Sequence, residues 1–474
     1  MARALQGTCA LLKGTKMKYA LAGMVVVCAT LLPRPARARL VVDHIVVRGS
    51  TDVTTRVLAA RMRLKPGDQV DFAVLQAAEQ RLTESDLFSS VHVLIDLPTP
   101  EAVRRMYLDA DTYPVEIVVD AVGKQPWFVF PTASVGSGDW AGGVVYANQN
   151  FLGRDVQLVG AGQVGQSNTY IFAAYRDPLM VGAPITYSTS ALYRREQIRL
   201  FAKHRLVMQV PTIVAGGDGQ IGWVLSAHTR AFAGFSARHQ ATSPAEGLAL
   251  DEMALPYNAE SGRIFLLQFQ FQYDDTRAEE GLRRGTLILL KNELSDRYWG
   301  SDFDYSKFEI RAEMYRRYRW NYPSLILKVV FDYPTSDRGV PVTEELRVGG
   351  SNLRGYLTNE FHGDTLFSAQ LEDQAVLFRL HLPWTRVRFN VASAIFVDAA
   401  SLLDRHPGGT TVAPPDTPPS PVRSKLNDVH ASFGGGVRII LPGVVVPALK
   451  IDLGYGIDVR DVAVTVSIAG GGIL

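Results

Sequence analysis

Cysteine and long apolar runs are both scarce in this 474-residue chain. The only cysteines are Cys9 and Cys28, so the chain beyond its N-terminal segment has no thiol for a disulfide framework or for thiol catalysis. No run approaches the ~18 to 20 consecutive apolar residues that a membrane helix needs. We therefore expect any membrane-spanning part to be built from strands.

An excess of charge of one sign is absent as well. The chain carries 49 Lys and Arg against 47 Asp and Glu, without a long basic block, which argues against a nucleic-acid partner. Its nine histidines show no metal-ligand spacing, and no nucleophile elbow or zinc-protease motif occurs. Gly160, Gly162 and Gly165 spell a dinucleotide fingerprint, but a strand-like segment follows them instead of a helix. These absences predict no enzyme activity, no metal and no cofactor.

The N-terminus has the order of parts of a secretory signal peptide. Lysines precede an apolar stretch at residues 19–32, and the small residues Ala36 and Ala38 follow it. We predict a signal peptide over residues 1–38, cleaved after Ala38, with Met17 as an alternative start. The other interpretation, an uncleaved anchor, is disfavoured because the apolar run is short. Cleavage would remove both cysteines.

Residues 39–122 differ from the rest of the chain in showing helical periodicity. Val53, Val57, Ala60 and Leu64 recur at helical spacing, and the Pro-Gly turn at residues 65–68 ends this first predicted helix. Asp71 is a suitable N-cap for a second helix, whose apolar face is predicted to hold Phe72, Leu75, Ala78 and Leu82.

Strands are predicted on both sides of these two helices. One lies at residues 40–48, and two more lie at residues 91–97 and 115–122, separated by a polar insertion at residues 98–113. The order strand, helix, helix, strand, strand predicts a small α+β domain over residues 39–122.

After about Gly123 the apolar pattern changes to a period of two. Odd positions from Phe265 to Tyr273 are apolar with glutamines between them, and residues 307–314, 324–332 and 449–458 alternate in the same way. One face of each predicted strand is therefore apolar and the other polar. A soluble sandwich would also alternate, so this pattern alone leaves two architectures open.

Three observations favour a membrane barrel over a sandwich: the export signal, the number of long strands, and the aromatic residues near strand ends. Residues 123–474, at roughly 22 residues for each strand and its connection, give about 16 strands, an even number as in bacterial barrels. We therefore predict a transmembrane β-barrel of about 16 antiparallel strands over residues 123–474, preceded by the α+β domain. Long polar connections near residues 236–260 and 402–428 are predicted to be extracellular loops.

The most informative motif is the segment at residues 349–356, which reads Gly-Gly-Ser-Asn-Leu-Arg-Gly-Tyr, with Glu372 and the Phe396-Val397-Asp398 run downstream. Here the chain resembles the superfamily of outer-membrane assembly and translocation barrels (BamA/TamA/FhaC-like). Members carry a loop with an Arg-Gly-aromatic motif that folds back into the barrel. Residues 45–49, 64–68 and 87–91 likewise resemble motifs of the family's periplasmic POTRA domain.

The resemblance implies a loop lock inside the barrel. Arg354, flanked by Leu353, Gly355 and Tyr356, would pair with Asp398, with Glu372 as a second acceptor and Phe396 on the same downstream strand. A guanidinium binds carboxylates bidentately, so one arginine can hold a long loop to the wall. Strand parity independently predicts that Asp398 faces the lumen, because Asp398 shares a face with Asn390, opposite Val397. The alternative is that Arg354 is an exposed hairpin-turn residue.

The resemblance also implies a seam where the first and last strands of the barrel meet. The last strand is expected at Val462, Val464, Val466 and Ile468. Gly470 and Gly471 after it are expected to weaken pairing, since glycine contributes no side chain. Ala400 stands where the family's downstream motif ends in glycine.

The function implied by the resemblance is assembly, insertion or translocation of other proteins at the outer membrane of a Gram-negative bacterium. The POTRA-like domain, in the periplasm, would capture unfolded or extended client proteins by strand addition. Outer-membrane lipids and periplasmic accessory proteins are further expected partners. The alternative is a passive pore or structural barrel that handles no client. A large, steady conductance would favour that pore, and a small, fluctuating conductance would favour translocation.

Overall fold

A computed structural model describes residues 39–468 apart from residues 86, 97–111, 179–183, 203, 245, 248–259, 280, 336–339, 382–387, 404–428 and 441–447. The predicted signal peptide, Gly470 and Gly471 lie outside the described residues, as does most of the insertion at residues 98–113. The chain divides into two compact units, with the boundary between Lys124 and Gln125. No helix in the described part is long and apolar enough to cross a membrane.

The N-terminal unit is a four-stranded sheet with two helices. Its elements are β1 (Arg39–Arg48), α2 (Thr55–Met62), β2 (Gln69–Val70), α3 (Phe72–Glu84), β3 (Phe88–Asp96) and β4 (Thr112–Gly123). The strand order is β2-β1-β4-β3, so β2 and β3 form the two edges. Asp71 caps α3 as predicted, because its carboxylate accepts a hydrogen bond from the backbone N–H of Val74 at 2.8 Å.

One predicted core position of this unit is wrong. Leu75, Ala78 and Leu82 are buried in the core, but Phe72 is 80% exposed. Phe72 is the first residue of α3, directly after the cap. At about 100° per residue it lies roughly 60–120° to one side of Leu75, Ala78 and Leu82 around the helix axis, outside the buried face. The pattern identified the helix correctly and its first core residue incorrectly.

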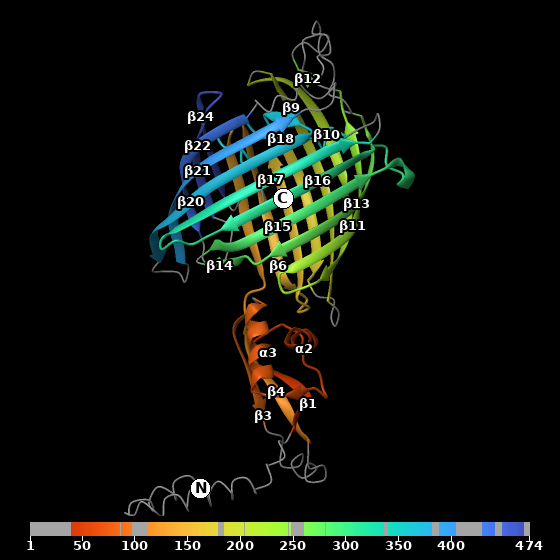
Figure 1. Ribbon diagram of the computed structural model, residues 1–474, viewed down its shortest axis with the longest axis vertical. Helices are drawn as coiled ribbons and strands as arrows, with labels where there is room; N and C mark the ends of the chain where they lie inside the picture. Colours follow the sequence, from red (N-terminus) through yellow and green to blue (C-terminus); the bar gives the residue numbers. More distant parts are fainter. Residues whose placement is uncertain are drawn as a thin grey trace, which may run out of the picture. The chain divides into compact units, whose positions relative to one another are not determined.

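The second unit is a closed antiparallel barrel, whose described residues form 16 long strands (Figure 1). The strands are β5 (Trp127–Gly136), β6 (Asp139–Phe151), β7 (Val156–Gly165), β8 (Asn168–Asp177), β9 (Ile185–Ala202), β10 (Arg205–Val224), β11 (Thr229–Thr242), β13 (Gly262–Asp274), β15 (Leu282–Ser295), β16 (Tyr305–Tyr315), β17 (Asn321–Pro334), β20 (Thr365–His381), β21 (Arg388–Leu403), β22 (Val429–Ile440), β23 (Leu449–Gly456) and β24 (Asp461–Ile468). Short elements β12 (Glu246–Gly247), β14 (Arg277–Glu279) and the 3₁₀ turn η1 (Arg297–Trp299) extend the connections.

The alternation of side chains follows the predicted two faces of the wall. Phe269 and Phe271 on β13 are exposed on the outside of the barrel, whereas Gln268, directly before Phe269, is buried and donates to Glu293 at 2.9 Å. An apolar outer face is stable only against lipid, because water would leave it unfavourably solvated. Gln270 and Gln272 share the parity of Gln268, so the glutamines of β13 lie on the polar, lumenal side of the wall.

The predicted connection near residues 236–260 begins too early. Strand β11 continues to Thr242, so residues 236–242 belong to the wall. Ser236 and Gln240 in this stretch are fully buried on the lumenal face. The polar composition that suggested a loop is therefore the lumenal half of an alternating strand. Residues 404–428 of the other predicted connection lie outside the described residues.

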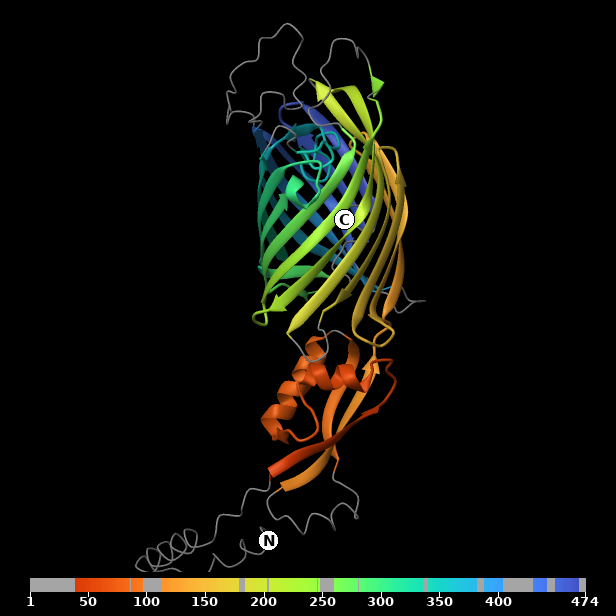
Figure 2. The same ribbon diagram turned by 90° about the vertical axis from the view of Figure 1, so that its right-hand side faces the viewer.

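The two ends of the barrel are named here by the chain itself. The proximal end is where β5 begins at Trp127, and the distal end carries the β5–β6 turn at Ser137 and Gly138. A long connection between β17 and β20, residues 335–364, leaves the wall at the distal end and folds into the barrel (Figure 2). It contains a small hairpin of β18 (Leu346–Val348) and β19 (Phe361–Gly363). This connection is called the lumenal loop.

Candidate functional site: a loop locked inside the barrel

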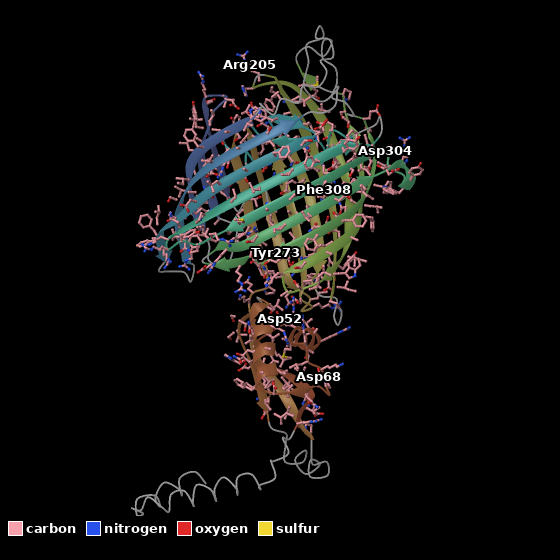
Figure 3. The ribbon with its side chains drawn as sticks, in the orientation of Figure 1. Asp52, Asp68, Arg205, Tyr273, Asp304 and Phe308 are labelled. Atoms are coloured by element: carbon pink, nitrogen blue, oxygen red, sulfur yellow. The ribbon has the colours of Figure 1, made fainter. Side chains whose placement is uncertain are left out.

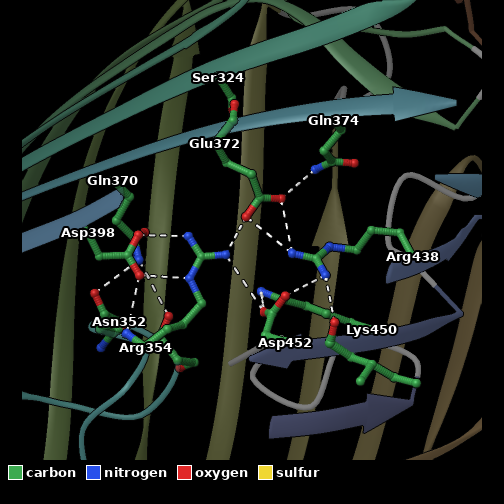
Figure 4. Close-up of polar contacts among 12 residues, drawn as sticks. Ser324, Asn352, Arg354, Gln370, Glu372, Gln374, Asp398, Arg438, Lys450 and Asp452 are labelled. Atoms are coloured by element: carbon green, nitrogen blue, oxygen red, sulfur yellow. Dashed lines mark hydrogen bonds and ion pairs between the residues drawn. The ribbon is translucent and has the colours of Figure 1, made fainter. Parts of the chain in front are cut away.

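Arg354, at the tip of the lumenal loop, is held by the wall of the barrel. Its Nε and Nη2 atoms donate to the two carboxylate oxygens of Asp398 on β21, each at 2.7 Å, which is a bidentate pair (Figure 4). Its Nη1 donates to Glu372 on β20. Its backbone N–H also donates to Asp398 at 3.2 Å. The structure thus brings together the three charged residues singled out in the sequence.

Burial makes these contacts strong. Asp398 is 0% exposed and Arg354 is also buried, so water does not compete for either group. The Phe396 ring lies under the guanidinium, with the Cζ atom of Arg354 3.4 Å from the ring centroid. Phe396 is two residues before Asp398 on β21 and therefore faces the same side. The aromatic ring covers one face of the planar cation, and the carboxylates accept the N–H groups along its edge.

Two further residues extend this network beyond the sequence prediction. Arg438 on β22 donates to Glu372 at 3.2 Å and pairs with Asp452 on β23 at 2.5 Å (Figure 4). Asp452 also lies 3.7 Å from Arg354 and 3.0 Å from the Nζ of Lys450. Arg354, Glu372, Asp398, Arg438 and Asp452 are called the lock. It joins the loop to four consecutive strands, β20 to β23.

Glycines allow the backbone of the loop to lie directly against the backbone of β23. A Cβ atom at Gly454 on β23 would lie 2.7 Å from the backbone N of Gly355. Gly355 has a φ of +95°, and its own Cβ would lie 2.8 Å from the N of Gly456. Only glycine fits this backbone conformation and this spacing without strain. The glycines of the loop and of β23 are therefore needed to position Arg354.

The residues beside Arg354 fix the loop on the same wall. Leu353 is fully buried in an apolar cluster with Leu346, Val348 and Ala400. The hydroxyl of Tyr356 donates to the carbonyl of Ala431 at 2.9 Å and lies 3.1 Å from the carboxylate of Asp458. Ala400 on β21 thus packs against the loop.

Other contacts hold the loop to the opposite side of the barrel. Arg347 pairs with Glu196 on β9 at 2.5 Å, and Arg238 on β11 pairs with Glu344 at 2.7 Å. Lys307 on β16 donates to the carbonyl of Glu344 at 2.6 Å. The lumenal loop therefore bridges the lumen and is anchored on walls that face each other.

The loop also reaches the strand pair at which the barrel closes. The N–H of Thr358 donates to the carbonyl of Ser137, in the β5–β6 turn, at 3.0 Å. The hydroxyl of Ser137 lies 3.2 Å from that of Thr465 on β24. A short chain of contacts thus runs from the lock through residues 354–358 to both strands of the seam.

The seam itself is a short ladder in the described residues. Residues 133–136 of β5 pair with residues 465–468 of β24, whereas on its other edge β5 pairs along its whole length with β6. Val462, Val464 and Ile468 are exposed on the outer face, and Val466 shares their parity. Gly470 and Gly471 lie outside the described residues, so their effect on this ladder stays a prediction.

A cavity of about 290 Å³ borders the lock on its proximal side. Tyr315, Tyr322 and Gln374 line it together with Arg354 and Arg438. No group of three or more His, Cys, Asp or Glu side chains in the described part of the chain is arranged to hold a metal ion. The cavity is therefore a polar space within the lumen, next to the charged network.

Comparison with known proteins places these features in a family. The Omp85 superfamily domain matches residues 150–463, and the POTRA domain, described as a surface antigen variable number repeat, matches residues 40–121. The first match alone covers well over half of the chain. The chain belongs to the Omp85 superfamily. Its N-terminal unit is a single POTRA domain, and its second unit is an Omp85 barrel.

Solved structures share this fold at low sequence identity. BamA from Haemophilus ducreyi, lacking POTRA domains 1–3, is 16% identical with a TM-score of 0.64, covering 90% of this chain and 84% of that chain. CdiB from Acinetobacter baumannii is 12% identical with a TM-score of 0.53, covering 91% and 73%. CdiB from Escherichia coli is 12% identical with a TM-score of 0.50, covering 97% and 100%. No curated protein matches this chain.

The sequence held a signal for the two lock residues that were missed. Arg438 follows three glycines and Asp452 precedes two, and each falls on the lumenal parity of its strand. Their pairing depends on the register between β22 and β23, which places Asp452 opposite Gly436. Alternation within one strand gives the face of a residue but not its neighbour across the ladder.

Proposed function

We propose that this Omp85 protein is an outer-membrane assembly, insertion or translocation factor, with its POTRA domain in the periplasm. In this proposal the POTRA domain captures extended clients, and the seam between β5 and β24 gates their passage. The observation that carries the proposal is the short seam ladder, joined through Ser137 to a loop that is locked across the lumen.

The client would bind at the free edge of the POTRA sheet. Strand β3 pairs with β4 on one side only, and strand addition to such an edge reads backbone rather than sequence. The N–H of Val93 on this edge already donates to the carboxylate of Glu79 on α3, at 2.9 Å. A client strand would therefore displace Glu79 to obtain a continuous ladder.

The seam would open between strands that share few backbone hydrogen bonds. Each paired residue lost at residues 133–136 exposes backbone groups that lipid cannot solvate. An incoming client strand would satisfy these groups, so exchange of one strand for another costs less than opening to lipid. No nucleotide is needed in this scheme, because folding and insertion of the client supply the free energy.

The proposal is tested by closing the seam covalently. Val135 and Val466 face each other across the β5–β24 ladder, and both lie on the outer face. Directly opposed strand residues are close enough for a disulfide. In cells depleted of the native protein, V135C/V466C would be expressed and oxidised, and the outer-membrane and secreted proteomes would be compared with those of wild type.

The matched control joins β23 to β24, a pair of strands that does not form the seam. Leu453 and Val464 pair across the β23–β24 ladder and are equally exposed on the outer face, so L453C/V464C places the same bond one strand away. We expect loss of outer-membrane or secreted proteins with the oxidised seam variant, rescue by reduction, and no loss with the control. General loss of barrel proteins would identify an insertase, and loss of one secreted protein a dedicated transporter. Full rescue by the oxidised seam variant would overturn gating at the seam.

A further inference from the structure

A cluster of arginines lies at the proximal rim of the barrel. It comprises Arg277, Arg284, Arg316, Arg317 and Arg319, all exposed, on β14, β15 and the β16–β17 turn. The strand register places them together, since Arg277 pairs with Arg284 and Tyr315 pairs with Gly285. These five residues are called the arginine cluster.

Exposed aromatic and apolar side chains surround the same turn. Tyr318 and Trp320 are 67% and 74% exposed, next to Arg319. On the neighbouring strand β20, Leu377, Phe378 and Leu380 are exposed beyond the position where Ala375 pairs with Asn321. Aromatic rings at the end of a barrel strand are most stable at the level of lipid headgroups. The arginine cluster therefore lies where the wall leaves the hydrocarbon.

The nearby carboxylates leave part of this positive charge uncompensated. Glu279 pairs with Arg317 and lies 3.9 Å from Arg284. Asp275 accepts a hydrogen bond from the N–H of Thr286, and Asp373 accepts one from Asn321 at 2.9 Å. Arg277, Arg316 and Arg319 form no ion pair with any described residue. Three guanidinium groups are thus available to an external anion.

We propose that Arg316 and Arg319 of the arginine cluster, together with Trp320, form a binding site for the phosphate headgroups of anionic phospholipids in the leaflet at the proximal end. Guanidinium groups bind phosphate oxygens in pairs. Arg316 and Arg319 belong to the same turn as the exposed rings, and Arg319 lies between Tyr318 and Trp320 in the chain. Leu377 and Phe378 would contact the first acyl carbons of the same lipid. The site would fix the depth of this wall in the membrane, independently of any client.

A lipid is a better occupant than a soluble phosphate because the site has an apolar side. Free phosphate would use the guanidinium groups alone and would leave Trp320 in water. A lipid brings the headgroup to Arg316 and Arg319 and buries the ring at the interface in the same event. This difference is the basis of the test.

The test uses the full chain in nanodiscs of phosphatidylcholine mixed with phosphatidylglycerol, with bromine on the acyl chain of one lipid at a time. Bromine quenches nearby tryptophan, and the signal of Trp320 is the difference between wild type and W320F. We expect brominated phosphatidylglycerol to quench Trp320 at least about twofold more than brominated phosphatidylcholine. Excess inorganic phosphate should leave this preference unchanged.

R316Q/R319Q should remove the preference, and R316K/R319K should keep most of it. The matched control is R205Q/R460Q, because Arg205 and Arg460 are exposed at the distal end and Arg460, like Arg319, has a positive φ (Figure 3 labels Arg205). Equal quenching by the two lipids in wild type would overturn the proposal, as would a preference that R316Q/R319Q retains. Loss of the preference in inorganic phosphate would assign the site to free phosphate instead.

Discussion

At the scale of single residues, the strongest constraint on this protein is the burial of Arg354 with Asp398. Neither charge has access to water, so each depends on the other, and Arg354 is also held by Glu372. Removing one member of such a pair leaves an uncompensated buried charge, whereas the intact pair contributes less net free energy than its contacts suggest. The lock is therefore better understood as a device that specifies one loop position.

We expect R354A to lower the stability of the barrel by roughly 3–5 kcal/mol and to release the lumenal loop. The release follows because Asp398 would then be buried without a cation. R354K should be intermediate, since lysine keeps the charge but cannot bind bidentately. Both effects are measurable, as the midpoint of thermal unfolding in detergent and as protease cleavage within the loop.

The control for this variant is another lumenal arginine. Arg311 pairs with Glu313 at 2.5 Å but is partly exposed to the lumen, so R311A should cost less than about 1 kcal/mol. Unchanged protease sensitivity of the loop in R354A would show that the loop is held by its other anchors.

The sequence predicts which side of the barrel wall a side chain faces, but not which residue it contacts on the neighbouring strand. Parity alone placed Asp398 on the lumenal side, and its complete burial agrees. The pairing of Arg438 with Asp452 could not be foreseen, since it depends on which residues of β22 and β23 lie opposite one another. The need for glycine at position 454 could not be foreseen either, because it arises from contact with a loop about 100 residues earlier in the chain.

At the scale of elements, the exposed edge strand β3 carries its own cap. The carboxylate of Glu79 on α3 accepts the N–H of Val93, as a carbonyl of an added strand would. Edge strands in soluble domains are commonly protected against unwanted pairing. A cap made from one side chain protects this edge and can also be displaced.

We expect E79A to bind an extended peptide more tightly than wild type, by about two- to tenfold. This corresponds to the roughly 0.5–1.5 kcal/mol of one hydrogen bond that no longer has to be exchanged. E79Q should bind like wild type, because the amide oxygen still accepts from Val93. The measurement is fluorescence anisotropy of a labelled peptide of alternating valine and threonine, with the full chain in detergent.

Glu116 supplies the control for charge in this experiment. It lies on β4, which is paired on both sides, so E116A removes a carboxylate without opening an edge. Equal affinities for wild type, E79A and E116A would mean that the peptide does not bind at β3. A gain in both E79A and E79Q would point to charge rather than to the cap.

Elements were easier to predict than their ends. The helices α2 and α3 and the strands around them follow from periodicity and from the Asp71 cap, yet Phe72 lies outside the core because its angular position around α3 is to one side of the buried face. Composition alone predicts a loop at residues 236–242, because a polar lumenal face and a polar loop have similar composition. The periods of two and 3.6 are physical, and the boundaries depend on tertiary contacts.

At the scale of the whole molecule, closure of the barrel follows from the solvent. Lipid offers no partner for backbone N–H and C=O groups, so an alternating sheet with an apolar outer face has to close on itself. The count of about 16 strands came from chain length and agrees with the described wall. Chain length could not predict that residues 335–364 would fill the lumen.

The occupied lumen leads to an expectation that separates a client-handling barrel from a passive pore. The loop is anchored on facing walls through Arg354 and Arg347, so ions have no wide path, and wild type should show a small, fluctuating conductance in a planar bilayer. Replacing residues 340–363 by a short Gly-Ser linker should give a large, steady conductance, whereas E79A, which lies outside the barrel, should behave like wild type. A large, steady conductance from wild type would mean that the loop leaves the lumen readily, and the protein would then be better described as a pore.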